Sequence, residues 1–229
     1  IWNFSMIHDF SRRLLHWHQH SGRHDLPWQI SVTPYRVWVS EIMLQQTQVS
    51  AVIPYFQRFV ERFPDVECLA KADIDEVLYL WSGLGYYSRA RNLHKTALII
   101  SQEMKGRMPE QIRELINLPG IGRSTAGAIL SLSMGQCQPI LDGNVKRVLC
   151  RYKAIAGWPG EKRVEKQLWI LAERFTPEGF AAEYTQAIMD LGALVCRRKA
   201  PACCLCPLST DCLANANGRQ NEFPEKKPK

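Results

Sequence analysis

Four cysteines near the C-terminal end of the chain could hold a metal centre. They are spaced Cys196-x6-Cys203-x2-Cys206-x5-Cys212. So short a loop closes around one centre at small entropic cost, and thiolates favour soft metals. Zinc sites of four cysteines usually consist of two CxxC pairs, whereas only Cys203 and Cys206 form such a pair here, with Cys204 expected to be a bystander. The spacing favours a [4Fe–4S] cluster, with a disulfide of a secreted protein as the alternative.

Two carboxylates lie among apolar residues and could perform acid–base chemistry. Glu41 belongs to the apolar segment 37–44, where it either occupies a solvated face or is buried with a raised pKa that suits a general acid. Asp142 precedes an apolar-periodic helix, so it is either a plain N-cap or a functional carboxylate that Gly143 leaves accessible. An acid that protonates a leaving group and a carboxylate that faces an oxocarbenium ion are the requirements of glycosidic bond cleavage.

A glycine-rich turn lies between two predicted helices and could bind phosphate. It reads Leu118-Pro119-Gly120-Ile121-Gly122, and the second helix is expected to begin at Arg123. The two glycines permit positive φ and leave N–H groups uncovered beside the positive end of the helix dipole. This pattern predicts a helix–hairpin–helix that holds the DNA backbone without reading bases, although an ordinary tight turn is the alternative.

The elements that must position these residues are helices. Apolar residues recur at helical spacing, no alternating run predicts a strand, and the predicted fold class is all-α. The histidines His16, His18 and His20 alternate at the end of the first helix, and we expect a solvated face there in place of a metal site. The predicted helical segments are 7–20, 34–44, 52–63, 73–80, 93–100, 168–175 and 184–195, with a further helix beginning at Pro109.

The bulk properties exclude a disordered or membrane-spanning chain. The 229 residues are 46% hydrophobic and carry a formal net charge of +7, which favours nucleic acid as the partner. No apolar run approaches the ~18 residues that a membrane span requires, and no targeting signal is recognisable. We expect a cytoplasmic monomer in the bacterial nucleoid.

Taken together, these motifs resemble the MutY-type adenine DNA glycosylases of the helix–hairpin–helix, iron–sulfur DNA glycosylase superfamily. The resemblance covers about 10–229. It is carried by residues 22–23, 26–28, 40–49, 83–87, 118–127 and 141–147 and by the cysteine array.

The resemblance implies a base-excision repair enzyme that removes adenine mispaired with 8-oxoguanine or guanine in double-stranded DNA, after flipping the base out of the helix. In this family pattern Glu41 protonates adenine N7, Asp142 stabilises or captures the oxocarbenium ion, and Asn144 helps to set that geometry. The residues that match substrate-pocket positions are Arg23, Trp28, Gln186 and Ser124. The residues that match DNA-binding positions are Gln45, Gln46, Tyr86, Gly120, Gly122 and Arg147.

The same resemblance implies the domain organisation and the cofactors. Residues 30–136 would form a six-helix module that holds the hairpin, and 1–29 with 137–215 would form the cluster module. In the family the active site lies between these modules. Residues 216–229 would be a linker toward a C-terminal domain that resembles Nudix hydrolases. The cluster would be structural, and the hairpin carbonyls are a candidate site for a monovalent cation.

One departure from related enzymes bears on the reaction. Sister enzymes of the endonuclease III type have a Schiff-base lysine where this chain has Ser124, so we expect no efficient strand-cleaving lyase activity. Two alternatives remain: an endonuclease III-like enzyme for oxidised pyrimidines, and a non-catalytic DNA-binding protein with a structural cluster.

Overall fold

The computed structural model describes residues 7–228 and contains only helices, turns and loops in that range. The predicted all-α fold class is confirmed. The chain divides into two compact units. The first, here called the cysteine unit, comprises Ile1–Arg23 and Gly135–Lys229. The second, called the hairpin unit, comprises His24–Met134.

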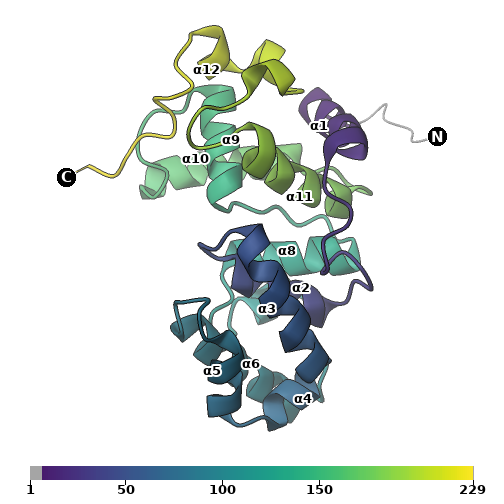
Figure 1. Ribbon diagram of the computed structural model, residues 1–229. Helices are drawn as coiled ribbons and strands as arrows, with labels where there is room; N and C mark the ends of the chain where they lie inside the picture. Colours follow the sequence, from purple (N-terminus) through teal and green to yellow (C-terminus); the bar gives the residue numbers. More distant parts are fainter. Residues whose placement is uncertain (1–6, 229) are drawn as a thin grey trace. The chain divides into compact units, whose positions relative to one another are not determined.

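The hairpin unit is built around one aromatic core. Its α2 packs against α3, α6 and α8, while α4 and α5 pack against α6 (Figure 1). Trp38 of α2 and Trp81 of α5 are completely buried, together with phenylalanines of α3. The helices are α2 Pro34–Leu44, α3 Val49–Arg62, α4 Val66–Lys71, α5 Ile74–Trp81, α6 Ser88–Glu103, α7 Ile112–Leu115 and α8 Arg123–Met134.

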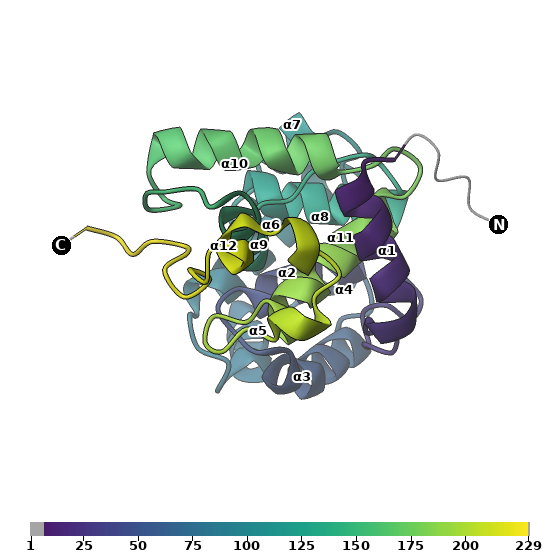
Figure 2. The same ribbon diagram turned by 90° about the horizontal axis from the view of Figure 1, so that it is seen from above.

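The cysteine unit combines long helices with a short irregular region. In it α1 packs against α11, and α9 packs against α10, α11 and α12; Figure 2 shows α12 beside α9. Phe10 stacks on Phe175 with ring centroids 4.2 Å apart, which joins α1 to α10. The elements are α1 Asp9–Ser21, α9 Gly143–Lys153, α10 Lys162–Phe175, α11 Ala181–Asp190, the π-helix η1 Leu191–Val195, the 3-10 helices η2 Cys203–Leu205 and η3 Ser209–Asp211, and α12 Leu213–Ala216.

Local capping residues fix the helix starts that matter for function. Thr33 accepts the Arg36 N–H at 3.2 Å, and Pro34 occupies the first position of α2. Likewise α9 begins directly after Asp142, which is its N-cap. These local signals place Glu41 on the last turns of α2 and Asn144 and Arg147 on the first turns of α9.

Two expectations about local structure were wrong, and one short helix was not predicted. The helix expected at Pro109 begins at Ile112, because Gln111 and not the proline is the N-cap residue. The helix α4 was not predicted, because its six residues are too few to show a periodic pattern. His18 does not lie on a solvated face: its side chain is 6% exposed and packs inside the cysteine unit, although His16 and His20 are exposed.

The C-terminal segment folds back onto the cysteine unit. Phe223 is 4% exposed, and Arg219 lies over its ring. The Nε atom of Arg151 donates to the Phe223 carbonyl at 2.9 Å. The packed part of the chain therefore extends to Phe223.

Among residues 7–228, no helix is both long enough and apolar enough to cross a bilayer.

Candidate functional site

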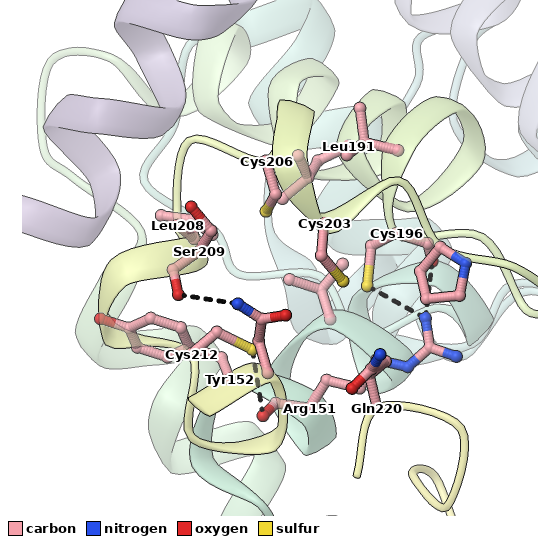
Figure 3. A pocket seen from close by; sticks show the side chains of 14 residues that line it. Arg151, Tyr152, Leu191, Cys196, Cys203, Cys206, Leu208, Ser209, Cys212 and Gln220 are labelled. Carbon is pink, nitrogen blue, oxygen red and sulfur yellow. Dashed lines mark hydrogen bonds between the residues drawn. The ribbon is translucent and has the colours of Figure 1, made fainter. Parts of the chain in front are cut away.

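The four predicted metal ligands line one cavity of the cysteine unit. Cys196, Cys203, Cys206 and Cys212 all contribute to its wall, and Figure 3 shows their sulfur atoms facing a common space. Cys204 is exposed and does not line this cavity. All eight cysteines of the chain are free.

The cysteine cavity offers four thiols to a metal group. Within residues 7–228, no group of three or more His, Cys, Asp or Glu side chains is arranged to hold one metal ion. A [4Fe–4S] cluster is held by four cysteine thiolates, and the four thiols that line this cavity supply that number. Burial raises the pKa of the Cys206 thiol to about 12, so a metal must displace its proton.

A buried arginine supplies positive charge beside the thiols. Arg151 is 3% exposed, and its NH1 lies 3.4 Å from the Cys196 sulfur (Figure 3). The same guanidinium donates to the carbonyls of Arg197 at 2.7 Å and Arg198 at 3.2 Å. A thiolate cluster needs such donors and such a countercharge, so the donor set fits a [4Fe–4S] group.

Asp142 is the N-cap of α9, and its surroundings destabilise its ionised form. Its Oδ1 accepts the Val145 N–H at 2.8 Å, and its Oδ2 accepts the Asn144 amide at 3.3 Å. Burial raises the pKa of Asp142 above its ordinary value, and the Val145 N–H and the charge of Arg147 offset only part of this shift. A cation that developed nearby would therefore be strongly stabilised by the ionised side chain.

Arg147 joins the start of α9 to the cysteine region. Its NH2 donates to Asn144 Oδ1 and to the Gly192 carbonyl, both at 2.7 Å. Its Nε donates to the Cys196 carbonyl, also at 2.7 Å. A Cβ atom at Gly192 would lie 2.6 Å from the Asn144 Cβ, so this contact requires glycine in the π-helix η1.

Asp190 is a buried carboxylate that sequence reasoning missed. It is completely buried and binds Arg23 through the backbone N–H at 2.7 Å, Nε at 2.9 Å and NH2 at 2.5 Å. The Gln186 amide donates to it at 3.0 Å, and His18 Nε2 lies 3.4 Å away. Burial acts to raise the pKa of Asp190, but the His18 and Arg23 hydrogen bonds and the Arg23 charge hold it below the ordinary value. Two predicted pocket residues, Arg23 and Gln186, thus both donate hydrogen bonds to the Asp190 carboxylate.

The hairpin unit carries the remaining predicted pocket residues. Glu41 is half-buried on α2, between the buried residues Ser40 and Ile42. Trp28 is 5% exposed and meets the Phe56 ring edge-on at 5.4 Å. Ser124 is half-buried in the first turn of α8.

Four of the six predicted DNA-binding residues line one cavity of the hairpin unit. Gln45 and Gln46 reach it from the end of α2, Tyr86 from the loop before α6, and Gly120 from the hairpin. This hairpin-unit cavity is also lined by Arg89. Gln46 and Tyr86 both have left-handed backbones, with φ of 57° and 50°.

The hairpin turn differs from the expectation at one glycine. Gly120 has φ of 79°, and a Cβ there would lie 2.9 Å from the Asn92 Cβ. Gly122 does not adopt the positive φ that a glycine permits, and α8 begins at the next residue. A Cβ at Gly122 would meet nothing within 4 Å, so its exposed backbone is open to close approach.

Two sequence signals could have identified the missed residues. Asp190 interrupts an apolar helical run, which is the criterion that selected Glu41. Arg89 lies in the first turn of α6, where the helix dipole disfavours a cation.

The fold and these residues define a class of DNA-repair protein. The family model for the HhH-GPD superfamily base excision DNA repair protein matches residues 39–174, more than half of the chain, and the chain belongs to this superfamily. Within it, the chain is 51% identical over 95% of its length to a protein of Buchnera aphidicola subsp. Acyrthosiphon pisum named adenine DNA glycosylase. The human protein of the same name is 42% identical over 93% of this chain. The predicted resemblance is confirmed.

These relatives are longer than this chain, which spans 62% of the Buchnera protein and 41% of the human one. Among solved structures, a thermostable thymine-DNA glycosylase aligns with a TM-score of 0.82 and 27% identity. The alignment covers 91% of this chain and 95% of that one. Since that glycosylase is named for a different base, the shared fold leaves the choice of base to individual side chains.

Proposed function

We propose that this chain catalyses removal of adenine mispaired with 8-oxoguanine or guanine by hydrolysing its N-glycosidic bond. The observation that carries the proposal is Asp142, a half-buried carboxylate with a raised pKa that accepts hydrogen bonds from Val145 and Asn144, in a chain 51% identical to a protein named adenine DNA glycosylase. A hydrolase of N-glycosyl bonds needs such an anion to face the cationic sugar.

In the proposed reaction, Glu41 donates a proton to adenine N7 and so makes the base a better leaving group. Ionised Asp142 stabilises the oxocarbenium ion, and Asn144 fixes the carboxylate that it contacts at 3.3 Å. Arg23 and Gln186, held by Asp190, would contact the flipped base with Trp28 and Ser124. Because a serine cannot form a Schiff base, strand cleavage would need a separate reagent.

DNA would be held by both units. Gly120 and Gly122 would contact the phosphate backbone beside the start of α8, while Gln45, Gln46 and Tyr86 would enter the duplex next to the mispair. Cys196, Cys203, Cys206 and Cys212 would hold a [4Fe–4S] cluster that shapes the loop joining them. This role is structural, and Arg147 would connect the loop to DNA and to Asn144.

A single-turnover assay tests the proposal. Duplexes would carry one adenine opposite 8-oxoguanine, guanine or thymine, with enzyme in excess and with or without alkali. The expected result is strand scission only after alkali, at the adenine opposite 8-oxoguanine and guanine and not at A·T. Scission without alkali would contradict the absence of lyase activity.

The same assay separates the alternatives. An endonuclease III-like enzyme would release no adenine. It would excise an oxidised pyrimidine from a duplex, and borohydride would trap its covalent intermediate with the DNA. DNA binding by cluster-loaded protein without release of any base would establish a non-catalytic binding protein.

A further inference from the structure

We propose that Arg89 is a positioning residue that holds the two duplex-entering segments of the hairpin unit, 45–47 and 84–86, in their working conformation. This inference rests on the proposed function, since the need for such segments follows from base flipping. Arg89 itself lies beneath them: it is 8% exposed, whereas Tyr86 is 58% exposed.

The guanidinium bridges the two segments through backbone acceptors. Its NH1 donates to the carbonyls of Ile42 at 2.9 Å, Met43 at 2.8 Å and Gln45 at 2.6 Å. Its NH2 lies 3.3 Å from the Leu84 carbonyl and 3.2 Å from the Gly85 carbonyl. One planar cation thus connects the end of α2 to the loop before α6.

The end of α2 depends on this cation for its cap. The last carbonyls of a helix have no partner inside it, and they form the negative end of its dipole. No basic residue lies in the last turn of α2, so Arg89 supplies the charge from α6. Its own place in the first turn of α6 is electrostatically unfavourable, which argues that the contact with α2 determines the residue.

The segments also contain backbone conformations that need support. Gln46 and Tyr86 have positive φ, which is unfavourable for residues other than glycine. Arg89 contacts the residues on both sides of Gln46, namely the Gln45 carbonyl and the Thr47 hydroxyl at 3.3 Å. It also contacts the carbonyl before Tyr86 and lies 5.3 Å from the Tyr86 ring. Within these two segments, Arg89 therefore contacts the chain next to both non-glycine residues that have positive φ.

Lysine cannot replace this arrangement. A guanidinium presents its donors in a rigid fork, whereas an ammonium is a compact point charge that cannot reach both segments together. Arg89→Lys therefore keeps the charge and removes the bridge. We expect the variant to fold with segments that no longer hold Gln46 and Tyr86 in place.

The decisive experiment compares two duplexes with adenine opposite 8-oxoguanine. In one, both nucleotides that flank the adenine are normal; in the other they are tetrahydrofuran abasic analogues, so the adenine is already unstacked. We expect Arg89→Lys to slow single-turnover excision by about 10- to 100-fold on the normal duplex and by less than about threefold on the unstacked one. Equal slowing on both duplexes, or none on the normal one, would overturn the proposal.

Two further variants complete the test. Arg107→Lys makes the same change at an exposed residue of the hairpin unit outside the cavity, and its rates should equal those of the unchanged protein. Thr47→Val removes one acceptor and leaves Arg89 intact, so it serves if Arg89→Lys does not fold. It should show the same pattern with a smaller slowing of about two- to fivefold on the normal duplex; no difference between the duplexes would contradict the positioning role.

Hydrogen exchange separates failure of this inference from failure of the proposed function. If the unchanged protein excises no adenine from either duplex, the proposed function is wrong. Arg89→Lys should still exchange backbone amides faster at 43–47 and 84–87 and nowhere else in the hairpin unit. Unchanged exchange in these segments would refute the positioning role, whatever the enzyme does.

Discussion

The cysteine unit contains a half-buried aspartate before α9, Asp142, and a completely buried one at the end of α11, Asp190, and their pKa values shift in opposite directions. Asp190 meets Arg23 through three hydrogen bonds and holds a lowered pKa. Asp142 receives the backbone N–H groups of Val145 and Asn144 and the Asn144 side-chain amide, but burial raises its pKa. The partners, and not the burial, distinguish the two sites.

In the proposed reaction, this difference separates a structural anion, Asp190, from a catalytic one, Asp142. The charge of Asp190 is already compensated, so it can orient Arg23 and Gln186 but gains little from a further cation. Asp142 is incompletely compensated, so an oxocarbenium ion would complete its environment. Active sites carry such destabilised groups at a cost in stability.

The largest effect is expected from Asp142→Asn. Asparagine keeps an acceptor for the Val145 N–H but removes the anion, so excision should fall by about 10⁴-fold. The free energy of unfolding should stay equal or rise, because a buried charge is lost. Single-turnover excision, DNA binding and thermal unfolding measure the three properties. Excision within tenfold of the unchanged protein would remove Asp142 from the mechanism.

Asp190→Asn should have the opposite profile. It leaves Arg23 without its countercharge, and breaking a buried pair costs about 3 kcal/mol of unfolding free energy. Excision should fall less than with Asp142→Asn. Denaturant unfolding measures the loss, and Glu183→Gln, at an exposed position of the same helix, should change it by no more than about 0.5 kcal/mol. An Asp190→Asn protein with an unchanged free energy of unfolding would show that Asp190 contributes no more stability than Asp142 does.

Arg147→Gln should have a smaller effect on excision. This residue connects the start of α9 to the cysteine region. Glutamine cannot reach Asn144, Gly192 and Cys196 together, so the Asp142 geometry should loosen and excision should slow about tenfold. Cluster absorbance per chain would show whether the Cys196 loop is also affected. Lys153→Gln, which removes a charge at an exposed position of α9, is the control and should leave both values unchanged.

The smallest expected effect is a difference between the pH at which excision declines and the pH at which the fold loses stability. Excision needs ionised Asp142, whose pKa is raised, so the rate should fall with decreasing pH above the ordinary aspartate value of 3.8. The stability from Asp190, whose pKa is lowered, is fully present above 3.8 and is lost only as pH falls through its lower value. As the pH falls, excision should therefore decline at a higher pH than the one at which protonation of Asp190 destabilises the fold. A parallel decline of rate and unfolding temperature would show that acid unfolding, not Asp142, limits activity.

Most of what the sequence predicted depends on neighbouring residues. Thr33 and Pro34 determine the start of α2, Asp142 caps α9 by accepting the N–H of Val145 three residues later, and the cysteines fall within one short segment. Such signals lie within a few residues, so they survive without knowledge of the tertiary fold. The all-helical class and the start of α2 could therefore be predicted, whereas α6 and α10 begin several residues before the predicted segments, at Ser88 and Lys162.

The missed features depend on contacts between distant residues. Asp190 meets Arg23 across 167 positions, and Arg89 meets the end of α2 across 44 to 47 positions. A charged residue in an apolar run signals that some partner exists, but only packing decides which. The burial of His18 on Asp190 has the same origin, since helical spacing alone could not show which histidine faces the interior.

The packing of Phe223 limits how this chain can be shortened for laboratory use. A fragment that ended before this residue would lose the carbonyl that Arg151 binds, at a cost of about 1–3 kcal/mol for the buried donor left behind. Because Arg151 also touches Cys196, such trimming would loosen one wall of the cysteine cavity. Fragments for crystallisation or labelling should retain the aromatic residue at 223, even though the nearest helix ends at Ala216.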